Sequence, residues 1–353
     1  MIFFRKPVST PDQVRGRPFR DHALIPVRAP AFWWRERGWA AALLAPVAAV
    51  YGAVAALRLR RNRYRVGVPV VCVGGLTLGG AGKTPTALAL GRLLAAARPF
   101  FLTRGYGGTL AGPVIVDPAR HDAGQVGDEA LLLARVASTV VARDRVAGAE
   151  AARAAGAGVI IMDDGFHSAA LVNDLALLVL DAGHGVGNGQ IFPAGPLRAP
   201  LFAQFAHAHA VLVIGNDQHA APLPPGSSGL ALFRGRLTPD AAAVAGLAGQ
   251  RLLAFAGIGH PDKFFATAEA VGTVVERRSF PDHHRFTAAE IASLLDEAAR
   301  RDLVLVTTEK DAARMTGNAA AAKLQARVRT LPVALVLEEA DGFLRFVMAR
   351  LKL

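Results

Sequence analysis

Val68-Pro-Val-Val-Cys-Val-Gly-Gly-Leu-Thr-Leu-Gly-Gly-Ala-Gly-Lys-Thr-Pro85 is the stretch that decides the fold. Its start, 68–73, is a short valine-rich run, which predicts a buried parallel strand. Next comes a glycine-rich turn that matches a phosphate-binding loop, except that Thr77 stands at the first glycine. The segment 85–97 is predicted to be a helix, for which Pro85 is a favourable first residue. Strand, loop and helix in this order predict a P-loop nucleotide-binding domain.

The residue types of this loop suit phosphate binding. Glycines let backbone N–H groups turn inward around the phosphates, and the helix that follows presents its positive end. Lys83 is expected to bridge phosphates and Thr84 to bind Mg²⁺. A glycine-rich turn with an incidental lysine is the structural alternative. We predict that MgATP binds to Thr77, Leu78, Gly79, Gly80, Ala81, Gly82, Lys83 and Thr84.

A second apolar segment, Val159-Ile-Ile-Met-Asp-Asp164, ends in two adjacent carboxylates. In P-loop proteins a strand of this kind places one carboxylate in the magnesium shell, and we expect the other near the phosphates. We predict that Asp163 binds the metal with Thr84 and that Asp164 contacts the substrate. Apolar strands often end in Asp for structural reasons alone, so this interpretation depends on the phosphate loop.

Phosphoryl transfer to a hydroxyl needs a group that orients the acceptor and takes up its proton. Asp128 precedes a predicted helix at 130–136, where capping the helix is its structural alternative. His283 lies in the segment Phe280-Pro-Asp-His-His284. Zinc binding there is not favoured, because adjacent histidines seldom reach one ion and no third ligand follows at typical spacing. The candidates for this role are therefore the segments Gly127-Asp-Glu129 and Phe280-Pro-Asp-His-His284, beside Lys83 on the nucleotide side.

Two further loops combine glycine or proline with a polar side chain. Arg104 opens Arg-Gly-Tyr-Gly-Gly, and Asn188 and Arg198 lie at the two ends of a long Gly/Pro-rich loop. Rigid backbone and a guanidinium in such loops suit contact with a polar ligand. We predict that Arg104, Asn188 and Arg198 bind substrate, with plain surface loops as the alternative.

The composition points to a membrane rather than to nucleic acid. Among 353 residues, 52% are hydrophobic and the mean hydropathy is +0.31, which is high for a soluble enzyme. The net charge of +12 favours an anionic partner, although genomic bias toward arginine is an alternative source of that charge. No nucleic-acid module is recognisable, so we predict contact with anionic lipids and no nucleic-acid partner. The lone cysteine, Cys72, excludes an intrachain disulfide and fits a reducing compartment. Arginines crowd together directly after an apolar run, at Arg58, Arg60, Arg61, Arg63 and Arg65.

That apolar run, 39–57, contains no charged residue and is at the lower length limit for crossing a bilayer as a helix. Trp33 and Trp34 precede it and arginines follow it, which is how an interfacial anchor is flanked. We favour a helix that docks in the membrane interface. A short transmembrane span and a helix buried against the protein stay open, since Pro46 and Gly52 weaken a span.

After the phosphate loop, short apolar runs alternate with alanine-rich helical stretches. This pattern predicts an α/β protein with a P-loop NTPase-type, mostly parallel sheet flanked by helices. A stretch rich in Pro, Gly and Ser at 216–228 then indicates a linker. We expect an N-terminal arm with a membrane-associating helix at 1–65, a P-loop domain at 66–215, a linker region at 216–246 and a second, smaller α/β domain at 247–353 that closes over the active site.

Taken together, these segments resemble the tetraacyldisaccharide 4′-kinase family from about residue 32 to the C-terminus. So many matches in the same order make the resemblance specific. The segments that carry it are VGGLTLGGAGKTP (73–85), LTRGYGG (102–108), VGDEALLL (126–133), DDGF (163–166), PAGPLR (193–198), AFAGIGHPDKFF (254–265), FPDHHRF (280–286) and VTTEKDAAR (306–314).

The resemblance implies transfer of the ATP γ-phosphate to the 4′-hydroxyl of an acylated glucosamine disaccharide 1-phosphate, giving lipid IVA. It further implies an enzyme at the cytoplasmic face of the inner membrane, because the acyl chains of the acceptor remain in the bilayer. By similarity, Asp128 corresponds to the carboxylate proposed as the base, and His283 to the histidine that supports it. Two domains that close over the substrate would bring this pair together.

The chain departs from the family pattern on the acceptor side. His167 and Ser168 stand where the family usually has Gln and His, and Ala199 stands where Glu is common. An alternative of another class is a membrane-docked P-loop nucleotide switch that acts on a protein partner. A guanine-specifying Asn-Lys-x-Asp segment would favour the switch, and the sequence contains none.

Overall fold

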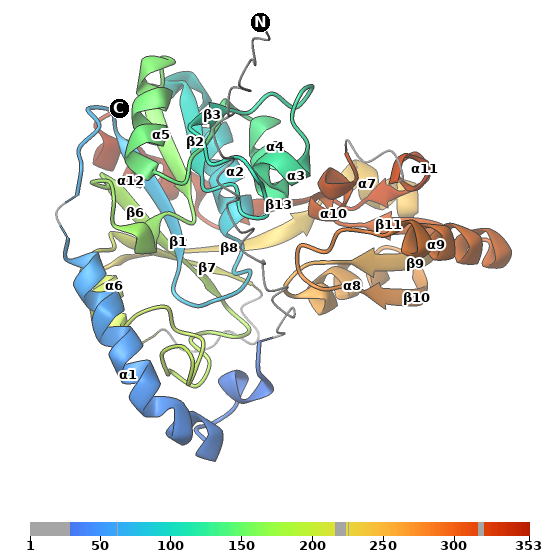
Figure 1. Ribbon diagram of the computed structural model, residues 1–353, viewed down its shortest axis with the longest axis horizontal. Helices are drawn as coiled ribbons and strands as arrows, with labels where there is room; N and C mark the ends of the chain where they lie inside the picture. Colours follow the sequence, from blue (N-terminus) through green and yellow to red (C-terminus); the bar gives the residue numbers. More distant parts are fainter. Residues whose placement is uncertain (1–28, 62, 216–223, 225, 317–320) are drawn as a thin grey trace, which may run out of the picture.

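The computed structural model describes residues 29–61, 63–215, 224, 226–316 and 321–353. Two sheets organise these residues, one much larger than the other (Figure 1). Among the described residues, nine strands form the larger sheet. In spatial order they are β13 (Val333–Leu337), β8 (Ala231–Pro239), β7 (Ala210–Ile214), β6 (Leu175–Asp181), β1 (Val70–Gly75), β5 (Val159–Asp163), β2 (Pro99–Thr103), β4 (Thr139–Val141) and β3 (Val114–Ile115).

The phosphate loop follows the strand at the centre of the larger sheet. β1 lies between β5 and β6 and runs parallel to both, with Val73 opposite Asp163 of β5. Because parallel strands end at one edge of a sheet, the last residues of β5 and β6 lie beside the start of the loop. These residues are Asp163 and Asp181. The carboxyl edge of such a sheet is where α/β proteins bind ligands.

Helices cover both faces of the larger sheet, and two apolar clusters fill the spaces between. One face receives α2, α4 and α12, and the other receives α5, α6 and the end of α1. The helices of this unit are α1 (Trp39–Leu59), α2 (Lys83–Leu93), α3 (Ala123–Val126), α4 (Asp128–Ala134), α5 (Arg145–Ala154), α6 (Leu201–Phe205) and α12 (Ala340–Leu351), with 3₁₀ turns η1 (Ala31–Trp34), η2 (Ala95–Ala97) and η3 (Phe166–Ser168).

The second unit is a smaller sheet with helices on both faces (Figure 1). Its longest helix begins at a capping box made by Thr287 and Glu290, and it buries Ile291 and Leu294 against the sheet. In spatial order the strands are β10 (Thr273–Ser279), β9 (Arg251–Ala256), β11 (Val304–Thr307) and β12 (Arg329–Thr330). The helices are α7 (Ala241–Leu247), α8 (Pro261–Glu269), α9 (Ala288–Arg301), α10 (Glu309–Met315) and α11 (Ala322–Gln325).

This architecture confirms the predicted fold class and changes two of the expected boundaries. The region expected to be a linker, 216–246, contains β8, a full strand of the larger sheet. At the other end, β13 pairs with β8, and α12 packs on the first unit instead of completing the second. An apolar run such as 333–337 does not reveal in the sequence which sheet it joins, because that choice depends on contacts far along the chain.

α1 lies on the outside of the first unit and exposes most of its apolar surface. Trp39 and Leu43 are 82% and 73% exposed, and the helix is long and apolar enough to cross a membrane. It touches the protein at small residues, such as Gly52, where a Cβ would stand 2.6 Å from Ile191 Cδ1. The alternative of a helix buried against the protein is therefore wrong for most of α1. The arm at 1–28 lies outside the described residues.

Candidate active site

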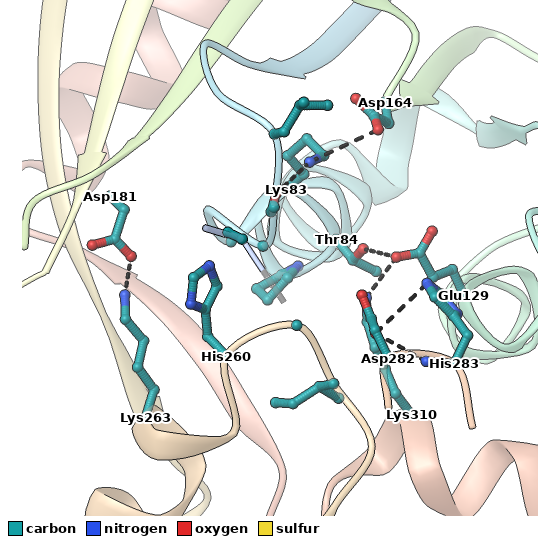
Figure 2. A pocket seen from close by; sticks show the side chains of 18 of the residues that line it. Lys83, Thr84, Glu129, Asp164, Asp181, His260, Lys263, Asp282, His283 and Lys310 are labelled. Atoms are coloured by element: carbon teal, nitrogen blue, oxygen red, sulfur yellow. Dashed lines mark hydrogen bonds and ion pairs between the residues drawn. The ribbon is translucent and has the colours of Figure 1, made fainter. Parts of the chain in front are cut away.

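The phosphate loop places Lys83 inside a polar frame. Lys83 Nζ donates a hydrogen bond to the carbonyl of Gly79 at 3.1 Å and lies 3.8 Å from Asp164 Oδ2 (Figure 2). Arg198 binds both carboxylate oxygens of Asp164 at 2.8 and 3.1 Å and donates from Nε to the Thr77 carbonyl at 3.1 Å. Burial lowers the pKa of Lys83, whereas the charge of Asp164 favours its ammonium form. The loop thus presents a cation whose surroundings are already fixed.

Two glycines allow the loop its curvature. Gly79 and Gly82 have φ values of +107° and +91°, a region that other residues rarely adopt. A Cβ at Gly82 would stand 2.7 Å from Ile214 Cδ1, and one at Gly79 would stand 3.1 Å from His260 Nε2. Both positions need glycine for conformation, and the crowding at each leaves little room for a side chain.

Asp163 at the end of β5 is a buried acid without a partner. It is 2% exposed, and neither carboxylate oxygen has a hydrogen-bond partner among the described residues. Burial, together with the charges of Glu129 and Asp164, raises the pKa of Asp163 to about 7. Asp163 and Thr84 line the same cavity, and their oxygens are the ligands that a hard cation prefers. These residues therefore fit Mg²⁺.

Glu129 links the phosphate loop to the second unit. Its Oε1 accepts a hydrogen bond from the Thr84 hydroxyl at 3.3 Å and one from Lys310 Nζ at 2.5 Å (Figure 2). Burial alone would lower the pKa of Lys310, but the charges of Glu129 and Asp128 raise it, so Lys310 is an ammonium ion. Because Lys310 lies on α10, the second unit supplies a cation to the nucleotide cavity.

Asp128 and His283 form a pair across the two units. His283 Nδ1 lies 3.3 Å from Asp128 Oδ2, and Arg314 Nε donates to the same oxygen at 2.6 Å. Burial alone would raise the pKa of Asp128, but His283, Arg314 and Lys310 hold it well below its usual range. Conversely, burial favours neutral His283, but Asp128 raises its pKa above the ordinary value. The Asp128 carboxylate thus faces a ring whose protonated form it favours, and the ring of Tyr106 is centred 4.7 Å from that of His283.

A second contact between the units lies on the other side of the phosphate loop (Figure 2). Lys263 of α8 forms an ion pair with Asp181 at the end of β6. Asp181 Oδ1 also lies 3.3 Å from His184 Nδ1, and the rings of His184 and His260 are 5.2 Å apart. The rings of Trp34 and His184 are centred 4.7 Å apart in an edge-to-face arrangement, so the segment before α1, the loop after β6 and the second unit converge here.

Sequence comparison decides between the candidate functions of this site. A family model described as tetraacyldisaccharide-1-P 4′-kinase matches residues 40–352, which is nearly the whole chain. The chain belongs to the tetraacyldisaccharide 4′-kinase family. It is therefore a kinase, an ATP-dependent phosphotransferase with an alcohol group as acceptor, and the nucleotide-switch alternative is not favoured.

Individual relatives of this kinase are similar over most of its length. A tetraacyldisaccharide 4′-kinase of Methylobacterium sp. (strain 4-46) is 58% identical over 312 residues, which cover 87% of this chain and 94% of the relative. One from Rhodopseudomonas palustris (strain HaA2) is 50% identical over 332 residues, covering 92% and 97%. Among solved structures, the "apo" form of LpxK from Aquifex aeolicus in complex with ATP gives a TM-score of 0.70 at 25% identity, covering 88% of this chain and 99% of that one. The ATP in that structure supports ATP binding by this kinase.

The structure brings most of the predicted site residues together. Side chains from the phosphate loop, Asp163, Asp164, Arg104 and Arg198 line one cavity with His283. Asp128 lies behind His283, at a smaller hollow that also touches His283. Asn188 is placed differently.

The Asn188 amide holds the 188–198 loop. Its Nδ2 donates to the carbonyls of Phe32 and Ala194, and its Oδ1 accepts from the backbone of Gln190. These contacts use the amide within the protein, and the residues that line the cavity do not include Asn188. Its predicted contact with substrate stays a prediction.

The positions that depart from the kinase family pattern have contacts of their own. His167 Nε2 lies 3.2 Å from the carbonyl of Gly75, and burial lowers the pKa of His167 to about 4, so this ring is neutral. Ser168 donates to the carbonyl of Gly165 at 2.6 Å. Ala199 is fully buried. His167 and Ser168 thus serve the backbone around the phosphate loop, and Ala199 belongs to the core.

Sequence reasoning assigned no role to several charged residues that the kinase structure places at the site. Lys310 and Arg314 belong to VTTEKDAAR, and Lys263 to AFAGIGHPDKFF. Both segments carried the family resemblance, which is the signal that could have drawn attention to them. Glu129 follows Asp128 directly, and its contact with Thr84 depends on folding.

Proposed function

We propose that the chain transfers the γ-phosphate of ATP to the 4′-hydroxyl of a tetraacylated glucosamine disaccharide 1-phosphate, forming lipid IVA in lipid A biosynthesis. Family membership supports this acceptor. The observation that carries the proposal is one cavity lined by Lys83 and Thr84 of the first unit and by His283 and Lys310 of the second. Such a cavity combines phosphate binding with proton uptake from a hydroxyl.

On the nucleotide side, we assign to Lys83 the charge that attracts the phosphates of ATP. Thr84 and Asp163 would hold Mg²⁺, which when bound neutralises phosphate charge. Arg198 and Asp164 keep the loop in shape through their two-bond contact and offer polar groups to the substrate. Positioning and electrostatic stabilisation make up most of the catalysis of phosphoryl transfer, and this arrangement suits both.

On the acceptor side, we assign Asp128 as the proton acceptor. The 4′-oxygen forms its bond to the γ-phosphorus while the bond from that phosphorus to the departing ADP oxygen breaks, and the hydroxyl proton passes to the carboxylate. His283 lies 3.3 Å from Asp128 Oδ2, where its protonated ring would favour the carboxylate form of Asp128. Arg104 lines the same cavity and would contact polar groups of the acceptor. Asn188 would act through the loop that carries Arg198.

We further propose that α1 docks this kinase on anionic lipid at the cytoplasmic face of the inner membrane. The exposed apolar side chains of α1 support this placement, because surface of this kind normally meets a membrane or a partner. Arg60 and Arg61 follow the helix directly and are exposed, where they would meet headgroup phosphates. The acceptor would enter from the same side, with its acyl chains still in the bilayer.

The direct test is transfer of radioactive phosphate. Purified chain is incubated with γ-labelled ATP, Mg²⁺ and tetraacyldisaccharide 1-phosphate in detergent micelles, and the lipids are separated. A labelled lipid that carries a second phosphate is the expected product, and an acceptor that lacks the 4′-hydroxyl should stay unlabelled. A folded preparation that labels no lipid, or labels both acceptors equally, would contradict the proposal.

A further inference from the structure

Arg314 is a buried side chain with contacts on both sides of the boundary between the two units. It comes from the end of α10, and its side chain is 5% exposed. On its own unit, Nη1 donates to the Gly257 carbonyl at 2.6 Å and to Asp311 Oδ1 at 2.8 Å. Across the boundary, Nε and Nη2 each lie 2.6 Å from Asp128 Oδ2. The guanidinium is thus fixed to the second unit and reaches the first.

This contact determines which oxygen of Asp128 stays available. Oδ2 is occupied by Arg314 and faces His283 Nδ1 at 3.3 Å. Among the described residues, Oδ1 accepts a single hydrogen bond, from the backbone N–H of Glu129 at 2.9 Å. A carboxylate oxygen has room for two such bonds, so Oδ1 retains an acceptor site. Arg314 therefore turns Asp128 so that a free lone pair remains.

The charges around Asp128 make Arg314 hard to replace. α10 presents Arg314, Lys310 and Asp311, the loop after β10 presents His283, and α4 presents Glu129, whose negative charge disfavours an ionised neighbour. Lys310 is already bound to Glu129. A buried carboxylate without enough positive partners takes up a proton. Loss of Arg314 would leave Asp128 with the Glu129 backbone N–H and His283 as its direct contacts among the described residues.

We propose that Arg314 is a positioning residue for Asp128, and that the carboxylate is oriented and ionised for catalysis only when α10 lies against α4. This inference rests on the proposed function, in which Asp128 accepts the proton. The proposal means that Asp128 can act as the base only when the second unit is docked on the first. It also explains why an arginine suits this position. The guanidinium contacts the Gly257 carbonyl and Asp311 of its own unit and Asp128 Oδ2 of the other unit at the same time.

The first experiment compares kcat, the KM for ATP and the pH profile of kcat in the wild type, Arg314→Lys and Arg314→Gln. Arg301→Gln is the matched control, because Arg301 pairs with Glu276 and Glu297 on the surface of the same unit. We expect Arg314→Gln to lower kcat roughly 10²-fold, as loss of general-base catalysis does, with little change in the KM for ATP. Arg314→Lys keeps a positive charge but lacks the two-pronged guanidinium. Its kcat should lie between those of the wild type and Arg314→Gln. In both variants the acid limb of the profile moves to higher pH.

The second experiment does not need catalysis. The pKa of His283 is measured by NMR titration of the ring signals in nucleotide-free protein, with His283→Gln to assign the signal. Arg314 lowers the pKa of His283 and Asp128 raises it, so Arg314→Gln should raise it while Arg314→Lys stays close to the wild type. If wild-type chain labels no lipid, the proposed function fails, while this titration still tests the contact.

Two outcomes would overturn the proposal. One is an active wild type whose Arg314 variants keep the same kcat and pH profile. The other is a folded Arg314→Gln variant, with a melting curve like that of Arg301→Gln, in which the His283 titration does not move. If Arg314→Gln does not fold, Arg314→Lys decides by kcat and by the acid limb of its pH profile, and an unchanged kcat and limb in that variant overturn the proposal.

Discussion

The phosphate loop and the Asp128 pair are built in opposite ways. Lys83 is held by Gly79, four residues away, and the loop takes its shape from a strand and a helix that flank it directly. Asp128 is held by Arg314, 186 residues along the chain, and by His283 from another loop of the second unit. The backbone of the phosphate loop is therefore shaped locally, whereas the Asp128 pair exists only while the two units touch. Changes on the two sides should accordingly affect different steps.

The largest effect is expected from Lys83→Ala. Removing the cation that faces the phosphates should lower kcat on the order of 10³-fold and weaken ATP binding as well. Steady-state kinetics and calorimetric titration with ATP measure the two effects. Lys323→Ala, on the exposed surface of α11, is the control and should leave both unchanged. A Lys83→Ala enzyme that turns over at nearly the wild-type rate would remove the loop from the mechanism.

Asp163→Asn should lower kcat by roughly 10²- to 10³-fold, because it removes a charged oxygen from the place where Mg²⁺ fits. The distinguishing readout is binding. In the wild type, Mg²⁺ should tighten ATP binding, and in Asp163→Asn this gain should largely disappear, while binding of metal-free ATP persists. Unchanged dependence of ATP affinity on Mg²⁺ would show that the metal is held elsewhere.

Asp128→Asn and His283→Gln test the other side and should each lower kcat roughly 10²-fold with little loss of ATP affinity. If the two residues act as a unit, the double variant is scarcely worse than the worse single variant. Full multiplication of the two losses would instead assign them separate roles, and a matching loss of ATP affinity would remove the distinction between the two sides.

The pH profile sharpens the same distinction. His283, Arg314 and Lys310 hold the pKa of Asp128 below its usual range, so the base of the wild type stays ionised into acid solution. His283→Gln removes one of these partners and should move the acid limb of kcat to higher pH. Lys83→Ala lies outside this group and should lower the whole profile without moving that limb. A limb that stays in place in His283→Gln would argue against the pairing.

The difference between the two regions also explains which parts of the fold and of the site could be predicted from the sequence. The strand, loop and helix from Val70 to Leu93 are determined within one stretch, so the spacing of glycines, Lys83 and Thr84 was enough to predict them. Asp163 was found because β5 lies beside β1, as parallel topology requires. The segments of Asp128 and His283 were candidates from their residue types, their pairing came from family resemblance, and their contact appears only in the folded chain.

What the sequence did not indicate depends on contacts between distant segments. Nothing in the run 333–337 indicates that β13 pairs with β8 of the larger sheet, since an apolar strand could pair with the edge of either sheet. Likewise Arg314 sits in a segment with Glu309 and Asp311, where a local ion pair would be the ordinary expectation. Its partner Asp128 becomes visible only when α10 is placed on α4.

The smallest effect is expected from substitutions in α1 that weaken membrane binding. Leu43→Asp and Val50→Asp change side chains of α1 that are 73% and 68% exposed, and each should weaken binding to anionic vesicles at least roughly tenfold. Activity in detergent micelles should fall less than activity on vesicles. Val336→Asp, an exposed position on β13, is the control for an added charge. Equal cosedimentation of all three variants with the vesicles would argue against docking through α1.

The most direct measurement is a crystal structure of the chain with a non-hydrolysable ATP analogue, Mg²⁺ and the acceptor lipid. We predict that the 4′-oxygen lies within hydrogen-bond distance, about 3 Å, of Asp128 Oδ1 and faces the γ-phosphorus, with Arg314 still on Oδ2. A 4′-oxygen placed against Asp181 and Lys263 instead, with Asp128 closed off behind His283, would contradict the assignment of the acceptor side.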